Sequence, residues 1–204
     1  YSGCYGMKPT HGLVPYTGIM PIESTLDHAG PMTQNVADNA LMLEVIAGAD
    51  GLDPRQYNVV TDTYTRAVTA GASGLKIGIV KEGFGHASSE SDVDEKVRAA
   101  ANILRECGAS VDEISVPWHL KGLPIWTPIA SEGATNQMMH GNGMGTGWEG
   151  MYTTSLLDYH ANWRGRADEL SDTLKITMFV GQYFLKHHRG HYYAKAQNLS
   201  RQLR

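Results

Sequence analysis

The chain has 204 residues, with 17 basic and 21 acidic side chains and a formal net charge of -4. These charges are spread along the chain without blocks, which argues against a nucleic-acid or membrane-surface binder, because such proteins gather Lys and Arg on one stripe or tail. Cys4 and Cys107 have the spacing of neither a disulfide framework nor a zinc site. With no apolar run near the roughly 20 residues that span a bilayer, we expect a cytoplasmic protein that binds a small molecule and has no nucleic-acid or membrane partner.

The first part of the chain alternates between turns and one helix. Residues 1–30 are dense in Gly and Pro with short apolar pieces between them, which predicts a buried, irregular segment with tight turns. Thr33 is the predicted cap of a helix over 34–47. Asn39 and Glu44 are expected to face solvent, because the apolar stripe at helical spacing is Val36, Ala40, Leu43 and Ala47.

A strand, helix and strand are predicted next in the chain. Residues 50–73 are polar and mixed, which indicates a surface connection. Residues 75–80 form a short apolar strand, Ser91 is positioned to cap a helix, and 109–116 is the following strand. Such a unit implies parallel strands joined by a right-handed crossover. The helix stripe expected to face the sheet is Val93, Val97, Ala100, Ala101 and Leu104.

The last third of the chain is predicted to be mainly helical. The pattern over 123–139 suits a helix, whereas 141–150 is too rich in glycine for regular structure. The final thirty-five residues keep a 3.6-residue apolar period with a break near Gly190. The predicted fold class is therefore α/β, a mixed sheet flanked by helices in one layered domain.

Two short motifs suggest a cofactor or a metal at first sight. Gly83 and Gly85 follow a strand, but the third glycine of a phosphate-binding turn is absent and the next helix starts too late to point at a phosphate. His187, His188 and His191 include an i, i+4 pair. No Glu occupies the position of an H-E-x-x-H motif, and neighbouring basic residues oppose a cation. We expect no cofactor and no metal.

Ser24, Asp27 and His28 contain the residue types of a nucleophilic triad. Triad members normally come from separate loops, because neighbours in one turn do not align a nucleophile, a base and an orienting acid. We expect instead a turn closed by Ser and Asp side chains, with His11 an ordinary loop residue.

Trp126, Glu132 and Asn136 lie in a helix-like stretch with little other charge. A buried Glu needs partners, and a large aromatic ring serves either as core or as the wall of a pocket. Periodicity alone favours a structural role for all three residues.

The opening residues carry a more specific signal. Ser2 to Gly12 (SGCYGMKPTHG) resembles the G-x-x-G-[LM]-K-P-T-x-G segment of the amidase-signature family. Weaker similarity follows at 130–136 (ASEGATN) and 190–197 (GHYYAKAQ), and it is greatest to the amidases of nitrile-degrading actinobacteria. The further matches at the family spacing are Gly18, Pro21, Ser24 to Asp27, Gly30, Pro31, Asp38 to Ala40 and Gly48 to Asp50.

The resemblance implies a partial amidase-signature fold, with 1–204 forming the central to C-terminal part of one domain whose N-terminal and C-terminal parts are missing. In that family a lysine and two serines, one of them the nucleophile, perform the chemistry on a Gly- and Ser-rich stretch upstream of this segment. The motifs that carry them are absent here, and Lys8 belongs to the structural K-P-T motif. We therefore assign no catalytic residue and expect the 204-residue chain alone to be inactive.

The resemblance also implies a substrate class. Family amidases hydrolyse small aliphatic or aromatic carboxamides, as in nitrile metabolism, to a carboxylic acid and ammonia. By position relative to 130–136, Trp126 falls where the family places an aromatic residue facing the acyl group, and Thr127 is a weaker second substrate-binding candidate. Apolar amides require such apolar walls. A homodimer is also compatible with this assignment.

Two other functions compete with amide hydrolysis. The glutaminase subunit of a tRNA-dependent amidotransferase shares the signature, but it carries an Arg for the glutamine carboxylate where this chain has Ser200. Serine cannot replace a bidentate guanidinium, and Arg201 is about 100° further around a helix. The third alternative is a non-catalytic domain that kept the fold and lost the active site.

Overall fold

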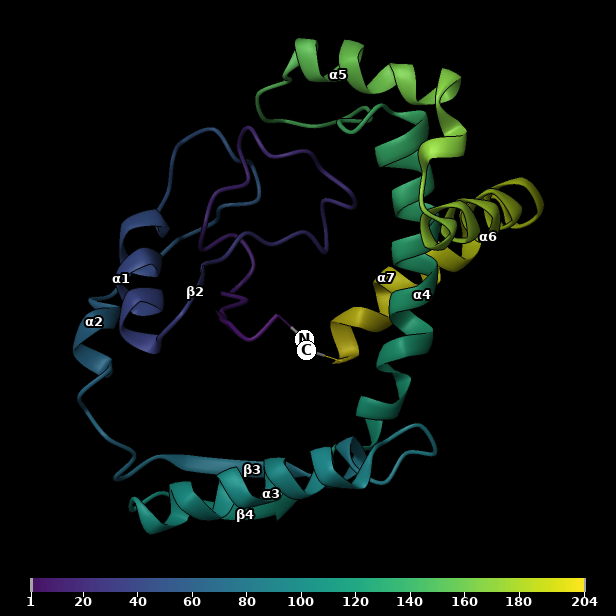
Figure 1. The fold of residues 1–204 in the computed structure, drawn as a ribbon. Helices are drawn as coiled ribbons and strands as arrows, with labels where there is room; N and C mark the ends of the chain where they lie inside the picture. Colours follow the sequence, from purple (N-terminus) through teal and green to yellow (C-terminus); the bar gives the residue numbers. More distant parts are fainter. Residues whose placement is uncertain (1, 204) are drawn as a thin grey trace.

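The computed structural model describes residues 2–203, and its elements form three blocks arranged in an arc (Figure 1). The first block contains β1 (Tyr5–Gly6), β2 (Met32–Thr33), α1 (Val36–Ile46) and α2 (Tyr64–Ala67). The second contains β3 (Lys76–Val80), η1 (Lys81–Gly83), α3 (Ser91–Glu106), β4 (Ser110–Ile114) and η2 (Pro117–Lys121). The third is helical: α4 (Gly122–Gly133), η3 (Ala134–His140), α5 (Thr154–Ala161), η4 (Asn162–Gly165), η5 (Ala167–Glu169), α6 (Asp172–His188) and α7 (His191–Leu203).

The predicted α/β class is confirmed, with the described strands forming two small sheets. β1 pairs with β2 antiparallel, and β3 pairs with β4 parallel, Lys76 opposite Ser110 and Val80 opposite Ile114. The predicted strand, helix and strand unit is therefore present. As predicted, 141–150 forms turns and irregular backbone, and the C-terminal helices break at Arg189 and Gly190, which both have positive φ.

Two expectations about α3 are wrong. The helix begins at Ser91 itself, with Glu90 as the residue before it, so Ser91 is not the cap. Val93 and Val97 are 54% and 52% exposed. The cluster against the sheet takes Ala101 and Leu104 from α3 and does not include the two valines. Its members are Ala72, Ala101, Ala109 and Val111, with Ile77, Ile79 and Leu104 packed against them.

The first block is held by polar contacts that the apolar pattern did not predict. Asn35, not Thr33, caps α1, because its side-chain oxygen accepts a hydrogen bond from Asp38 N at 2.8 Å. Asn39 is buried rather than solvent-facing, and its amide donates to Tyr5 O at 3.0 Å. Glu44 also has a partner, since it accepts hydrogen bonds from the backbone N–H and the hydroxyl of Thr65.

The connection over 50–73 is not wholly a surface segment. Arg55 forms an ion pair with Asp53 at 2.8 Å, and both side chains are almost fully buried. The guanidinium also donates to Asp27 O at 3.0 Å and lies over the ring of Tyr16. Burial raises the pKa of Asp53, but hydrogen bonds from Arg55 and from the Tyr16 N–H outweigh it and hold the pKa below its ordinary value. This pair anchors the connection to residues 16–27.

The helical block forms around α4 and η3. α4 packs against α6 and α7, and η3, a π-helix, continues it in place of the predicted uninterrupted helix. Close packing at the α4–α6 crossing requires glycine, because a Cβ on Gly181 would lie 2.1 Å from Ser131 O. Met138 and Met139 fill the core beneath α6, together with Leu174 and Met178.

Candidate functional site

A cavity of about 480 Å³ lies beside the junction of α4 and η3. Its walls come from five parts of the chain: the turn at Glu23, the helix residue Glu132, the glycine-rich loop at Met144, Leu185 on α6, and Tyr193 at the start of α7. Asn136 lies on the same wall as Glu132 and is exposed. A pocket of this size is within the range that binds small organic molecules.

The turn at Glu23 is built by Asp27. The Asp27 carboxylate accepts hydrogen bonds from Ile22 N at 2.7 Å and Glu23 N at 3.1 Å, as an Asp-closed turn does. Burial raises the pKa of Asp27, and the two backbone N–H bonds and nearby Arg55 oppose that rise. Closure of the turn by Asp27 is thus confirmed, whereas a part for the Ser24 side chain stays a prediction, and Asp27 is occupied in holding the turn.

Glu23 is only 3% exposed, and both of its carboxylate oxygens accept hydrogen bonds. Oε1 accepts from the Tyr193 hydroxyl at 2.7 Å, and Oε2 accepts from the backbone N–H and the hydroxyl of Thr25 at 3.0 and 2.5 Å. Gly133 allows the close approach, because a Cβ there would lie 2.1 Å from Glu23 Cγ. Gln197 completes the network by donating to Thr25 Oγ1 and the Tyr193 oxygen.

The same network fixes the protonation state of Tyr193. Burial, followed by the hydrogen bond and charge of Glu23, raises the pKa of Tyr193 to about 12. The phenol therefore stays protonated at neutral pH and donates its proton to the Glu23 carboxylate. Both carboxylate oxygens of Glu23 are thus occupied by hydrogen bonds from within the chain.

Glu132 is the second buried carboxylate of the cavity and is 1% exposed. Its Oε1 accepts from Tyr193 N at 3.1 Å, in the first turn of α7, where the helix dipole favours a negative charge. Oε2 accepts no hydrogen bond from residues 2–203. Burial raises the pKa of Glu132, while the Tyr193 N–H and nearby His188 lower it by smaller amounts.

Trp126 and Thr127 lie on α4 outside this cavity. Ile125 and Ile129 turn toward α7 and are buried, whereas Trp126, one residue around the helix, is 53% exposed. The Thr127 hydroxyl donates to Leu123 O at 2.9 Å within its own helix. The structure thus places Trp126 on an open face and does not bring it to Glu132. Its role as a substrate wall stays a prediction.

Lys8, His11 and His28 form a local cluster. Lys8 Nζ donates to Pro9 O at 3.2 Å and lies 3.4 Å from His28 Nε2. His28 Nδ1 lies 2.6 Å from Leu26 O, and the ring of His11 stacks edge-on against that of His28. These contacts are those of a loop, and the residues do not assemble a triad.

The structure shows no phosphate-binding turn at Gly83 and Gly85 and no metal site at the C-terminal histidines within residues 2–203. The Asp94 carboxylate accepts a hydrogen bond from Gly85 N at 3.1 Å. The backbone N–H that a phosphate would need is therefore already used. His187 and His188 pack against the ring of Tyr183. Among residues 2–203, His, Cys, Asp and Glu form no group able to hold a metal.

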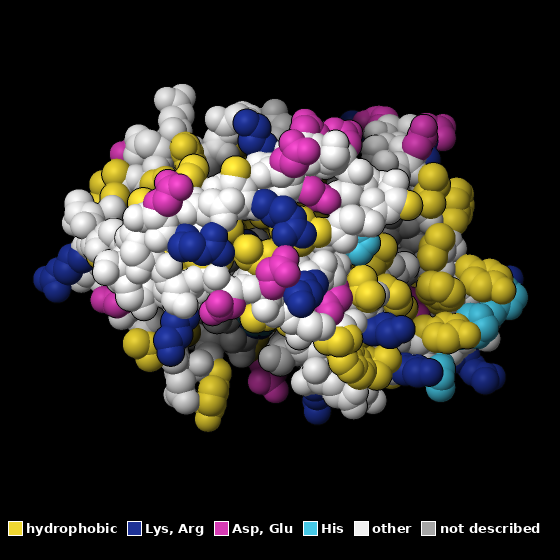
Figure 2. Space-filling view, turned by 90° about the horizontal axis from the view of Figure 1, so that it is seen from below, with side chains coloured by type: hydrophobic (Ala, Val, Ile, Leu, Met, Phe, Trp, Pro, Cys, Tyr) yellow, Lys and Arg dark blue, Asp and Glu magenta, His cyan; other side chains and the backbone are white. Residues whose placement is uncertain are grey.

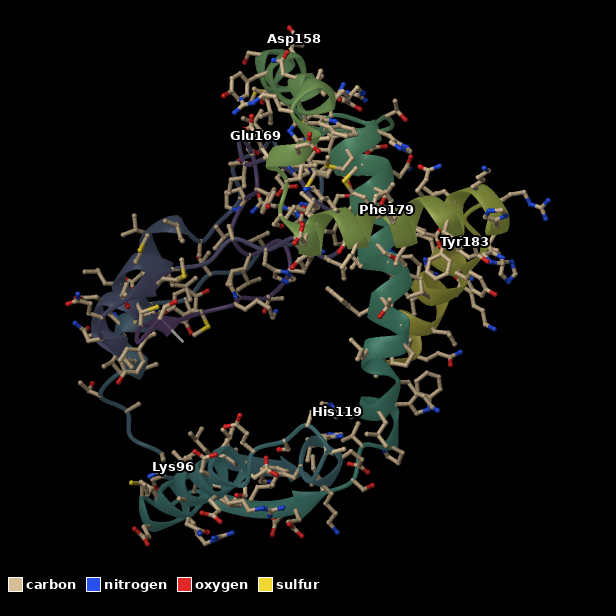
Figure 3. All side chains as sticks on the ribbon, turned by 45° about the vertical axis from the view of Figure 1, so that its right-hand side comes forward. Lys96, His119, Asp158, Glu169, Phe179 and Tyr183 are labelled. Carbon is tan, nitrogen blue, oxygen red and sulfur yellow. The ribbon has the colours of Figure 1, made fainter. Side chains whose placement is uncertain are left out.

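His187 and His188 lie in the last turn of α6, whereas His191 begins α7. Figure 2 shows hydrophobic and histidine side chains gathered at the end of the molecule where α6 lies in Figure 1. Figure 3 places Phe179 and Tyr183 on this helix, and both are more than half exposed. No helix within 2–203 is long and apolar enough to cross a membrane.

The sequence did not reveal the Glu23 side of the cavity. Its periodicity favoured a structural role for Glu132, which would need partners if buried. Glu23 carried no local signal, because its partner Tyr193 is 170 residues away in the chain. Gly133 could have been suspected as a point of close packing, since a glycine within a helix is unfavourable unless a neighbour approaches closely.

The chain belongs to the amidase family, whose model matches residues 1–204. It is 42% identical over 205 residues to an enantioselective amidase of Rhodococcus rhodochrous, covering 99% of this chain and 39% of the relative. It is 37% identical over 200 residues to the A subunit of the glutamyl-tRNA(Gln) amidotransferase of Exiguobacterium sibiricum, covering 97% of this chain and 40% of that protein. The chain therefore spans about two fifths of the length of these relatives.

Solved structures share the fold. The A subunit of the glutamyl-tRNA(Gln) amidotransferase of Thermotoga maritima matches with a TM-score of 0.64 at 22% identity, over 98% of this chain and 38% of that one. The peptide amidase of Stenotrophomonas maltophilia matches with a TM-score of 0.58 at 23% identity, over 86% of this chain and 36% of that one. The predicted amidase-signature fold is confirmed.

Proposed function

We propose that the complete protein is a cytoplasmic amidase that hydrolyses small aliphatic or aromatic carboxamides to a carboxylic acid and ammonia, as in nitrile metabolism. Residues 1–204 would be the central to C-terminal part of its single domain. Family membership supports the reaction class, and the 42% identity to an enantioselective amidase supports amides as substrates. We further propose a serine nucleophile outside this chain, no cofactor, and a homodimer.

The observation that carries this proposal over a glutaminase is the environment of Ser200. Its hydroxyl donates to Gln197 O at 2.8 Å, within its own helix, and offers no charge to a substrate carboxylate. A glutaminase needs a cation at such a position, because a carboxylate is recognised best by a bidentate guanidinium. Arg201 is exposed and lies about 100° further around α7.

The proposed reaction needs a base, a nucleophile and a group that stabilises the oxyanion. A neutral lysine would accept a proton through one serine, the second serine would attack the amide carbonyl, and backbone N–H groups would stabilise the oxyanion. Residues 1–204 would supply the wall of the acyl pocket through Trp126 and Thr127. By the same reasoning, the purified 204-residue chain is expected to release no ammonia from benzamide.

A glutaminase is the second candidate, supported by the 37% identity to the A subunit of an amidotransferase. Ammonia release by the complete protein from benzamide and isobutyramide, compared with glutamine, separates the two. Hydrolysis of the simple amides but not of glutamine supports the amidase. Hydrolysis of glutamine alone would replace it with the glutaminase, and no hydrolysis of any substrate would favour the non-catalytic domain.

Trp126 provides the sharper test of the pocket. Trp126→Ala in the complete protein should change the ratio of kcat/KM for benzamide and isobutyramide by about tenfold or more, because one methylene of fit is already worth about 1–3 kcal/mol. The ratio is insensitive to a uniform loss of folded enzyme. Trp118→Ala, which removes an equally large ring from η2, is the matched control and should leave the ratio unchanged. If the ratio is unchanged in folded Trp126→Ala, Trp126 does not line the acyl pocket.

A further inference from the structure

The glycine-rich loop over 141–150 contains the one Asn-Gly pair of the sequence, Asn142–Gly143. A side-chain amide in this position is open to attack by the next backbone nitrogen, because glycine has no Cβ to hinder the approach. The nitrogen bonds to the side-chain carbonyl carbon, and the side-chain amide leaves as ammonia with the proton of the backbone N–H. Water then opens the resulting cyclic imide at either carbonyl, which gives aspartate or isoaspartate.

The fold holds the nitrogen that would attack. The Gly143 N–H donates hydrogen bonds to Met138 O at 2.8 Å and to Gln137 O at 3.1 Å. Both acceptors belong to η3, and Gly143 itself is buried. Attack requires that this nitrogen give up its proton and move toward the side chain of Asn142. Two carbonyl partners oppose both changes, so the reaction is held back while the loop stays on η3.

The Asn142 side chain is held as well. Its Oδ1 accepts a hydrogen bond from Arg164 Nη1 at 2.7 Å, and bonds of this charge-assisted kind are the stronger ones. The guanidinium also donates to His140 O at 3.3 Å and lies 5.0 Å from the centre of the Trp163 ring. The cation withdraws electrons from the amide carbon, which favours attack. No attack follows, however, while the nitrogen of Gly143 stays bonded to η3.

The composition of the loop favours local opening over global unfolding. Five of the ten residues over 141–150 are glycine, which gains more conformational freedom on release than any other residue. Loops open with free energies at the low end of the range for local unfolding, well below that of the helices they join. Opening of this kind frees the nitrogen of Gly143 and the side chain of Asn142 together.

We propose that Asn142–Gly143 is a site of spontaneous deamidation, which the η3 carbonyls and Arg164 hold back in the folded protein and which reacts when the 141–150 loop opens. The reaction consumes one water, releases one ammonia and needs no cofactor. It is independent of the amide hydrolysis proposed above.

Deamidation would change the loop in two ways. In the aspartate product, a carboxylate replaces the amide and pairs with Arg164. In the isoaspartate product, an extra backbone carbon lies between residues 142 and 143 and displaces Gly143 from its acceptors on η3. Met144 and Trp148 of the same loop line the cavity, so the second product would also alter the cavity wall.

Peptide mapping by mass spectrometry tests the site in the complete protein, incubated at mildly alkaline pH either folded or unfolded in urea. Conversion of Asn142 should be at least about tenfold slower in the folded protein, because the bond from the Arg164 cation alone shifts the open population by about that factor. Asn58 is the internal control. It shares a positive φ but precedes Val59, whose branched side chain hinders attack, and it should keep its amide in both samples.

Two outcomes of this experiment would overturn the proposal: equal rates at Asn142 in the folded and unfolded samples, or no conversion in urea. Urea concentrations below the unfolding transition test the role of the loop. Conversion should already accelerate there, because local opening precedes global unfolding. A rate that rises only in step with global unfolding would contradict loop opening as the trigger.

Two variants test the part of Arg164. Arg164→Met removes the guanidinium from Asn142 and should accelerate conversion in the folded protein about tenfold. Arg166→Met is the matched control, because Arg166 pairs with Glu169 on the surface (Figure 3) and should leave the rate unchanged. Circular dichroism establishes that each variant is folded. The wild-type comparison in urea needs neither variant, and an unchanged rate in folded Arg164→Met would overturn the protection assigned to Arg164.

Discussion

The β3–α3–β4 block and the region around α4 are held together in different ways. The block is closed by neighbours in the chain: strands separated by one helix, and a cluster made mainly of alanine and valine. Around α4, the contacts join residues far apart. The Tyr193 hydroxyl bonds to Glu23 across 170 residues, and Ser24 N bonds to Gln137 Oε1 across 113.

The comparison shows in which region charged side chains contribute to stability. In the β3–α3–β4 block, charged pairs such as Arg98 with Glu113 are about half exposed, and such pairs contribute little to stability. Around α4 and the turns that dock on it, buried charges hold distant segments in position. A change there should therefore cost more than a change of the same kind in β3–α3–β4.

The largest effect is expected for Arg55→Met in the complete protein. It leaves Asp53 buried without its ion pair and removes the bond to Asp27 O, and breaking a buried pair costs about 3–5 kcal/mol. Urea unfolding measures the loss in the free energy of unfolding. Arg98→Met, which breaks an exposed pair, is the control and should cost about 0–1 kcal/mol. Equal losses in the two variants would abolish the distinction between the regions.

Gly181→Ala tests the crossing of α4 and α6. The new Cβ would lie 2.1 Å from Ser131 O and 2.2 Å from Thr135 Oγ1, so the helices must separate. Overpacking of this kind typically costs about 1–3 kcal/mol, and contact with backbone places it at the upper end. Gly122→Ala, at an uncrowded position at the start of α4, should be near neutral in the same unfolding measurement. A stable Gly181→Ala protein would mean that the two helices cross less tightly than these distances require.

Tyr193→Phe should cost about 1–3 kcal/mol, because it leaves Glu23 Oε1 without its donor. The pKa of Tyr193 is about 12 in the folded protein against 10.0 ordinarily, so the unfolded chain loses this proton first. The stability is therefore complete below pH 10 and is lost as the pH rises to about 12. Tyr192→Phe should retain this loss, whereas Tyr193→Phe should lack it. Parallel alkaline profiles for the two variants would contradict the assignment.

The smallest effect is expected for Val97→Ala on α3. Val97 is 52% exposed, and substitutions at exposed positions usually change stability by no more than about 0.5 kcal/mol. Leu104→Ala, within the cluster against the sheet, should cost about 2 kcal/mol or more. If thermal unfolding of the complete protein shows Val97→Ala to be as harmful as Leu104→Ala, Val97 faces a core after all.

The sequence determined the features that depend on neighbours in the chain. The order of strands and helices from Lys76 to Ile114, the irregular glycine-rich loop and the break at Gly190 all follow from local periodicity and backbone preference. The ordered motif from Ser2 to Gly12 identified the family. It did so because a turn that needs particular glycines and prolines preserves their spacing.

Tertiary structure alone decided which polar residues are buried. Asn39 is polar and was expected to face solvent, yet it lies inside because the carbonyls of Tyr5 and Pro31 need a donor there. Glu23 and Glu132 share one cavity because Gly133 lets the turn approach α4 and because α7 returns its first turn to the same place. Local patterns record neither event, since burial of a polar group depends on a partner that folding brings from elsewhere in the chain.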